Sequence, residues 1–479
     1  MLNRIIFILL LLVYQTGFTQ QFFKKIPIQA TLGTIVSSDS LTPFLLRTKQ
    51  YGLVPLKSGI GYFNLSLRKE YDSLYSTIDR RLKRFGYGYG IETHLNIGKL
   101  NQLLMPVSHF KVRYGAFELY GGRRREIQGL VDTLGTMGSY IWSGNALPMP
   151  KIEISIPNFT PILKNGLIAI KGNFAHGWFG KADSVQNVWL HQKSLYARIG
   201  KPDWKVHLIG GFNHQVQWGG YPTKPFYDEI SQQTISKFGT DFTTFFKIST
   251  GVRLNKYGKG NQAGVPSNEA GNRAGNHLGT VDIGITTHLR HTTFFIYKQS
   301  IYEDGSLYYL SNIIDGLYGV SIRRNIGIIK NITIEYFHSL NQGGDVVELQ
   351  PELRGRDNYF NNSLYKNNWS YKNFGIGTPL ITKNNEGSNL SNTIFFNNRI
   401  QSISFGAVYF TGKIVNKTEI LNLNNYGTYY IPLTIKQLSF KQTTFFRIKG
   451  ITYHLALSLD SNHFENFNLG TEIKILKNL

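Results

Sequence analysis

Cysteine is absent from the 479-residue chain. Its absence excludes a disulfide framework, a lipoprotein anchor and any thiolate metal site. Charged residues are scarce too, at 17%, against roughly 25% in ordinary soluble domains. Beyond the first residues, no segment approaches the run of about 18 apolar residues that a membrane-spanning helix needs. Proline contributes only 15 residues, against 49 glycines. The chain is therefore neither a disulfide-stapled scaffold nor a helical membrane protein.

Aromatic side chains are abundant, at 14% of the chain, with 28 Tyr and 32 Phe. Many aromatics, many glycines and few charges are typical of an outer-membrane β-barrel with aromatic girdles and tight turns. The formal net charge is +23, a value that first suggests nucleic acid. For an exported chain with scattered Lys and Arg, an anionic polysaccharide or the phosphates of lipopolysaccharide fit better. A second interpretation is that the cations line a wet lumen or reach the headgroups.

The N-terminus predicts export. Arg4 is followed by an apolar run of nine residues, from Ile5 to Val13, and Gly17 and Thr19 suit a signal-peptidase site. We therefore predict a signal peptide over residues 1–19. Residues 20–58 lack a clear period and are interpreted as an N-terminal periplasmic segment or partial plug. The barrel itself is expected over residues 59–479.

The stretch Leu190–Gly220 carries the clearest strand pattern. Gly200-Lys201-Pro202-Asp203 has the composition of a tight turn. After it, Val206 and Leu208 alternate with more polar neighbours such as His207, so the hairpin has one apolar wall and one polar wall. A transmembrane barrel with lipid outside and water inside shows this pattern. A soluble sandwich shows it as well.

Similar rhythms recur to the end of the chain. About 460 mature residues, at roughly 25 per strand with its loop, give about 18 antiparallel strands, within a range of 16 to 20. Ser108–Gly121 and Thr243–Leu254 are each expected to be one strand. Short N-terminal helices are possible at Ser40–Gly52 and Lys69–Lys83. Two polar stretches, Lys256–Asn276 and Gln342–Asn392, are expected as extracellular loops.

A set of short phrases resembles the capsule assembly Wzi family, in its Bacteroidota branch. The resemblance implies an outer-membrane barrel of about 18 strands with a lectin-like role in holding surface polysaccharide. Family members from enterobacteria carry an N-terminal helical plug. The phrases run in order along the chain: SGNALPMPKIEIS (143–155), HGWF (176–179), LHQKSLYARIG (190–200), GGFNHQVQWGG (210–220), GNHLG (275–279), YEDGS (302–306), DGLYG (315–319), NYFNN (358–362), GIGTPL (375–380) and NNR (397–399).

Catalytic chemistry has little support. The chain contains no P-loop, G-x-S-x-G or H-E-x-x-H motif. The histidines have no helical metal spacing, so we expect no metal and no cofactor. Glu303 and Asp304 suggest a glycosidase pair, but neighbours on a strand face opposite sides, and Asp304-Gly305 reads better as a turn. We expect no enzymatic activity.

Sugar recognition uses aromatic faces together with Asn and Arg side chains. The stretch Arg354–Tyr371 has that composition. The alternative is a surface loop packed on itself. Trp178 and Trp218 fit the interface belt of a membrane protein as well as a binding site. The predicted polysaccharide-binding residues are Arg354, Arg356, Asn358, Tyr359, Tyr365, Trp369 and Tyr371.

Three functions follow from a barrel of this kind. We favour a monomeric outer-membrane protein that binds capsular or other anionic surface polysaccharide without catalysis and helps attach the capsule. Its surroundings would be outer-membrane lipid and lipopolysaccharide, with no nucleic acid. A porin-like diffusion channel is the alternative, and an outer-membrane enzyme acting on glycan or lipid is a third.

Overall fold

The computed structural model describes residues 27–71, 84–181, 184–228, 232–251, 274–303, 307–345, 356–383, 394–462 and 467–479. Eighteen strands form one antiparallel sheet, and eight short strands lie in connections between them. The short strands are β8 (Val185–Gln186), β11 (Tyr221–Pro222), β12 (Phe226–Asp228), β13 (Gln233–Ile235), β18 (Ser370–Tyr371), β19 (Phe374–Gly375), β20 (Thr382–Lys383) and β21 (Phe395–Asn397). The eighteen are β1 (Ile28–Ser37), β2 (Ile60–Lys69), β3 (Phe85–Gly98), β4 (Gln102–Tyr114), β5 (Phe117–Arg123), β6 (Lys151–Pro161), β7 (Ile168–Gly180), β9 (Val188–Ile199), β10 (Val206–Trp218), β14 (Asn276–Leu289), β15 (Thr292–Tyr302), β16 (Gly316–Arg324), β17 (Ile329–His338), β22 (Ile400–Thr411), β23 (Ile414–Gly427), β24 (Pro432–Ile448), β25 (Ile451–Asn462) and β26 (Asn468–Asn478).

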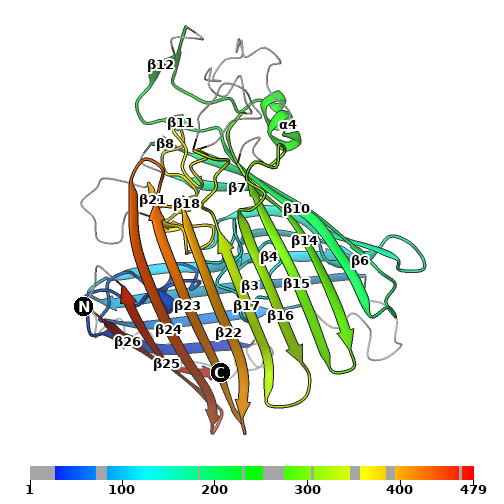
Figure 1. Ribbon diagram of the computed structural model, residues 1–479, viewed down its shortest axis with the longest axis vertical. Helices are drawn as coiled ribbons and strands as arrows, with labels where there is room; N and C mark the ends of the chain where they lie inside the picture. The colour runs from blue at the N-terminus through cyan, green and yellow to red at the C-terminus, as the bar shows by residue number, and fades with distance from the viewer. Residues whose placement is uncertain are drawn as a thin grey trace, which may run out of the picture.

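The sheet closes on itself. Each of these strands pairs with the next along the chain, and β1 pairs with both β2 and β26, so no edge is left open (Figure 1). The predicted barrel of about 18 strands is confirmed. The expected boundary at residue 59 is wrong, because β1 belongs to the wall. Of the described residues before 59, those between β1 and β2 leave the wall, and they carry the short helix α3 (Phe44–Arg47).

The wall is polar inside and apolar outside. On β14, Thr280 and Asp282 are fully buried, whereas Val281 and Ile283 are exposed. An exposed apolar face around a buried polar one inverts the pattern of soluble domains and identifies a transmembrane barrel. The hairpin of β9 and β10 follows the same rule, with His207 buried inside and Leu208 exposed outside.

The two ends of the barrel differ (Figure 1). We call one end the short-turn end. It carries the tight turns, such as Gly115-Ala116 between β4 and β5 and Gly412-Lys413 between β22 and β23, and it also carries the C-terminal end of β26. The other, the long-loop end, carries the connections 219–275 and 339–399. The polar stretch Gln342–Asn392 belongs to the long-loop end where it is described, at residues 342–345 and 356–383, and most of Lys256–Asn276 lies outside the described residues.

Two expected strands have other structures. Ser108–Gly121 is two strands, β4 and β5, because Gly115 makes a turn with φ 60°. Thr243–Leu254 is not a strand: the described part is helix α4 (Phe242–Thr250). Asp241 caps its first turn by accepting from the Thr244 amide, and Gly251 ends it with φ 71°. Most of Lys69–Lys83, a possible helix, is not among the described residues.

No helix in the described ranges is long and apolar enough to cross a membrane.

Candidate functional site

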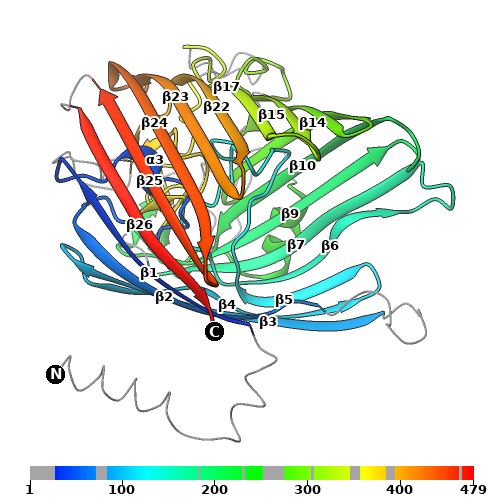
Figure 2. The ribbon, with the colours of Figure 1, turned by 90° about the horizontal axis from the view of Figure 1, so that it is seen from below.

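Three chain segments fill the lumen and form what we call the lumen plug (Figure 2). They are hydrogen-bonded to one another through their backbones. The Tyr51 amide donates to the Gly144 carbonyl at 2.9 Å, and the Thr378 amide donates to the Tyr140 carbonyl at 2.8 Å. Residues far apart in sequence thus form one body inside the barrel. The lumen plug comprises residues 41–58, 124–149 and 356–381.

Inward carboxylates of the wall and of the plug tie the two together. Asp132 of the plug accepts from Arg323 at 2.6 and 2.9 Å and from Asn331 at 2.8 Å. In the opposite sense, Asp282 of β14 accepts the plug amide of Leu130 at 2.9 Å. A buried carboxylate without a partner costs free energy. Moving the plug would leave Asp132 and Asp282 without these partners, so the contacts hold the plug in place.

Glu335 of β17 holds the same segment at its middle. Its carboxylate accepts from the Thr136 hydroxyl, the Met137 amide and the Tyr297 hydroxyl, each at 2.7 Å. Because the acceptors are buried and the donors come from wall and plug alike, the segment cannot slide without leaving polar groups unpaired.

A lysine-rich cluster fixes the first plug segment. Glu419 of β23 contacts Lys49 at 2.8 Å, Lys441 at 2.8 Å and Lys417 at 3.1 Å. Lys49 also donates to the Thr136 carbonyl at 2.9 Å, which joins the first and second plug segments. Three of the cations of the chain therefore lie in the lumen, paired with one buried carboxylate.

Apolar packing fills the space between these contacts. Tyr140 packs against Phe337 of the wall, with ring centroids 4.7 Å apart, and edge-to-face against Phe360 at 6.2 Å. Phe360 in turn contacts Phe395 at 5.4 Å. The hydrophobic core of this barrel therefore lies in its lumen, between wall and plug. Such packing is typical of a protein interior rather than of a water-filled channel.

The predicted sugar-binding residues are placed unevenly. Arg356 is exposed and Asn358 is half-buried, whereas Arg354 falls outside the described ranges. The four aromatic residues are almost fully buried, so their rings pack within the plug and cannot stack on a sugar where they stand. In this arrangement the self-packed alternative describes these four rings, which are Tyr359, Tyr365, Trp369 and Tyr371.

Arg356 lies in a cluster that the sequence did not single out. Its guanidinium carbon is 5.9 Å from the ring centroids of both Tyr429 and Tyr430, in the turn between β23 and β24. Arg399 lies over Tyr429 at 3.9 Å. The ring of Tyr430 is 64% exposed. We call these four residues the rim cluster, since they lie at the long-loop end. The sequence feature that could have indicated this cluster is the doublet Tyr429-Tyr430 in a short turn.

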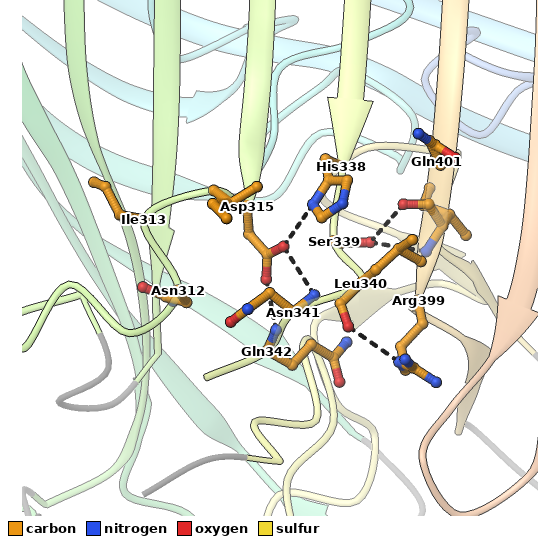
Figure 3. Close-up of polar contacts among 12 residues, drawn as sticks. Asn312, Ile313, Asp315, His338, Ser339, Leu340, Asn341, Gln342, Arg399 and Gln401 are labelled. Carbon is orange, nitrogen blue, oxygen red and sulfur yellow. Dashed lines mark hydrogen bonds and ion pairs between the residues drawn. The ribbon is translucent and has the colours of Figure 1, made fainter. Parts of the chain in front are cut away.

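A hub of hydrogen bonds supports the rim cluster (Figure 3). Asp315, at the start of β16, accepts from the His338 ring at 2.9 Å, the Asn341 amide at 3.1 Å and the Gln342 amide at 2.7 Å. The hydroxyl of Tyr359 donates to the same carboxylate at 2.8 Å. Four acceptor sites of one carboxylate are used, which fixes the turn that follows β17.

That turn holds the rim residues in place. Arg399 donates to the Leu340 carbonyl at 3.2 Å (Figure 3). The Tyr429 hydroxyl donates to the Asn341 carbonyl at 2.9 Å. Burial raises the pKa of Tyr429, against the opposing effect of Arg399, so the phenol stays protonated and donates at neutral pH. The rim cluster is therefore preorganised, as binding sites on rigid supports are.

Asp315, His338 and Ser339 have the residue types of a hydrolytic triad but not its geometry. The Ser339 hydroxyl donates to the Asn398 carbonyl at 2.7 Å and accepts from the Ile400 amide at 3.0 Å. It is turned into the loop scaffold rather than poised for attack. Glu303, the other acid considered, accepts the Phe360 amide at 2.6 Å, and Asp304 lies outside the described ranges.

Among the described residues, no group of three or more His, Asp or Glu side chains could hold a metal ion.

No family model matches the chain, and no curated protein sequence matches it. Among solved structures, it is similar to Wzi of Escherichia coli, an outer-membrane protein involved in group 1 capsule assembly and a carbohydrate-binding β-barrel. The two share 12% identity over 96% of this chain and 86% of that one, with a TM-score of 0.59. At that identity the similarity shows the fold.

Two further structures align at lower scores. OccK5 (OpdH) of Pseudomonas aeruginosa is 8% identical over 95% of this chain and 97% of that one, with a TM-score of 0.45. A BenF-like porin of Pseudomonas fluorescens Pf-5 is 11% identical over 95% and 99%, with a TM-score of 0.45.

Proposed function

We propose that this chain is an outer-membrane barrel that binds an anionic surface polysaccharide at its rim cluster, without catalysis, and so helps to attach a capsule to the cell. The observation that carries the proposal is the pairing of a filled lumen with a preorganised cationic and aromatic rim. A ligand that cannot pass through the barrel is held at its mouth.

The rim chemistry suits acidic sugars. Guanidinium groups bind carboxylates in bidentate geometry, and the exposed Tyr430 ring offers a face for an apolar sugar surface. Arg356 and Arg399 share Tyr429, which spaces the two cations on one rigid support. The net charge of +23 favours encounter with a polyanion.

We place the chain in the outer membrane because its outer wall is apolar and because a signal peptide is expected. Barrels of bacterial outer membranes have short periplasmic turns and longer extracellular loops. By that rule the long-loop end, with the rim cluster, faces outward. The porin alternative needs an open lumen, and the described residues fill it. The carbohydrate-binding role of Wzi supports the proposal as an analogy of fold only.

Binding by the purified full chain tests the proposal. In detergent, we expect it to bind a polyuronate more tightly than a neutral dextran of equal length. The double variant Arg356→Ala/Arg399→Ala should lose affinity for the polyuronate by about 10- to 100-fold, because two charge-assisted contacts are removed. The matched control is Arg324→Ala/Arg447→Ala, which removes two exposed arginines at the short-turn end.

Equal binding by the two double variants would reject the rim cluster as the site. In cells, deletion of the gene should release surface polysaccharide into the medium. A deletion strain that keeps its whole capsule attached would reject the function itself.

A further inference from the structure

A groove of about 710 Å³ lies on the outer wall of the barrel. Its floor includes Phe212 of β10 and Val281 and Ile283 of β14, which point away from the lumen. On the long-loop side, the end of α4 at Gly251 and the connection 307–313 border it. Because the outer wall faces lipid, this groove opens to the bilayer rather than to water.

The depth of the groove is marked by a row of tryptophans. Trp178, Trp189 and Trp218 are direct neighbours in the register of β7, β9 and β10. Such outward rings gather at the membrane interface. Phe212 lies six residues further from the long-loop end than Trp218, about 20 Å along the tilted strand. The floor is therefore at acyl-chain depth, in the leaflet on the long-loop side.

Two lysines flank the apolar floor. Lys298 of β15 donates to the Ile313 carbonyl at 2.7 Å and lies 4.9 Å from the Tyr318 ring centroid, and it lines the groove. Lys193 of β9 lines the opposite side and donates to a backbone carbonyl at the end of α4. Three strand spacings separate β9 from β15, about 14 Å. Both ammonium groups donate to backbone carbonyls of long-loop connections, on the side of the groove where headgroup anions lie.

Helix α4 extends this surface into the interface. Phe245 packs on Trp218 with ring centroids 5.7 Å apart, and Ile248 is buried beside it. On the far side of the helix, Phe242 is 80% exposed and Phe246 is 57% exposed. A helix bound to an apolar wall that still exposes two phenylalanines is typical of a segment lying in the headgroup region.

We propose that this groove binds a phosphorylated glycolipid of the outer leaflet, the lipid A part of lipopolysaccharide. An acyl chain lies over Phe212, Val281 and Ile283, and the phosphates pair with Lys193 and Lys298. The inference rests on the outward placement of the long-loop end given above. It adds a lipid site that is separate from the rim cluster and lies on the opposite side of the wall from the plug.

Native mass spectrometry of the full chain in detergent, with purified bisphosphorylated lipid A added, tests the proposal. Lys193→Ala/Lys298→Ala should bind lipid A about tenfold more weakly, since charge-assisted contacts to phosphate are lost. Val281→Trp/Ile283→Trp should also lower binding, because it fills the floor while keeping the wall apolar. Lys330→Ala is the matched control: Lys330 also donates to a backbone carbonyl, at 2.9 Å, and lies over a ring, but at the short-turn end.

Several results would overturn the proposal. One is equal lipid A binding by Lys193→Ala/Lys298→Ala and by Lys330→Ala. Another is that the wild type binds dephosphorylated lipid A or phosphatidylethanolamine as tightly as lipid A. A third is that the wild type forms a dimer through the groove and that the tryptophan variant disrupts this dimer. The heat-modifiable gel shift verifies that each variant is folded. Polyuronate binding is measured on the same samples. A variant that loses lipid A binding but keeps polyuronate binding separates the two proposals, because each proposal has its own binding measurement.

Discussion

Asp132 is a single residue on which the position of the plug depends. It is fully buried and accepts from Arg323 and Asn331 of the wall. Burial by itself raises the pKa of Asp132, but the hydrogen bonds from Arg323 and Ser321 outweigh that effect and hold the pKa below its usual range. The carboxylate is therefore charged at every physiological pH, and the wall is built around that charge.

Replacement of this carboxylate should loosen the second plug segment. We expect Asp132→Asn to lower the local stability of residues 130–140 by about 1–3 kcal/mol, because Arg323 loses its ionic partner. Amide hydrogen exchange of that segment measures the loss. Because its pKa is lower in the folded state, the Asp132 carboxylate stabilises the fold at pH values above its unfolded-state pKa of about 3.9. This stabilisation is lost as the pH falls through the folded-state pKa. The difference between variant and wild type should thus be full at pH 7 and shrink in acid. A pH-independent difference would contradict this account.

Gly33 and Gly210 make a matched pair of wall glycines. A Cβ at Gly33 would lie 2.3 Å from the Tyr62 ring, whereas a Cβ at Gly210 meets nothing within 4 Å. Gly33→Val should therefore destabilise the barrel by about 1–3 kcal/mol through overpacking. Gly210→Val should be neutral. The midpoint temperature of the heat-modifiable gel shift distinguishes them, and equal midpoints would contradict the inward placement of Gly33.

Among the elements, β1 has the largest structural role for its length. It bridges β2 and β26 through continuous registers, from Ile28 paired with Leu67 to Ser37 paired with Gly470. Without it, both neighbours would present unpaired backbone groups to lipid, which membranes do not tolerate.

A truncation pair tests this role. A mature chain that starts at Gly59, the boundary expected from the sequence, should give no heat-modifiable band. A chain that starts at Gln20, after the expected signal peptide, should fold. The measurement is the gel shift after refolding in detergent. A folded barrel from the shorter chain would show that β2 can pair with β26 directly.

Helix α4 shows where strand rhythm misleads. Thr243–Leu254 was expected as a strand, yet Asp241 and Gly251 supply helix caps that were legible in the sequence. The segment forms a helix outside the wall because its apolar residues face Trp218 on one side and lipid on the other. Membrane-interface helices and barrel strands have similar compositions, and caps separate them better than alternation does.

For the whole molecule, local alternation was enough to predict the barrel but not its contents. The alternation of His207 and Leu208 indicates which face of the strand is polar, and eighteen such strands close the barrel. The plug depends instead on contacts between distant residues: Asp132 and Arg323 are 191 positions apart. Composition alone does not separate a sugar-binding loop from a buried one: it predicts that Trp369 binds sugar, yet this residue is fully buried.

The same distinction between wall and contents decides how the molecule works. A barrel of this size would be a pore if it were empty. Here, buried carboxylates of wall and plug, an ion cluster around Glu419 and packed aromatic rings occupy the lumen across the described residues. We therefore place both proposed functions on the outer surfaces, at the rim cluster and the lipid-facing groove, and not in the lumen.

Single-channel recording of the full chain in a planar lipid bilayer tests this claim most directly. With the plug held by the buried contacts described above, the account predicts a silent membrane at moderate voltage, with insertion verified by the gel shift of the same sample. Stable, ohmic conductance steps of the size expected for an open pore of eighteen strands would contradict it.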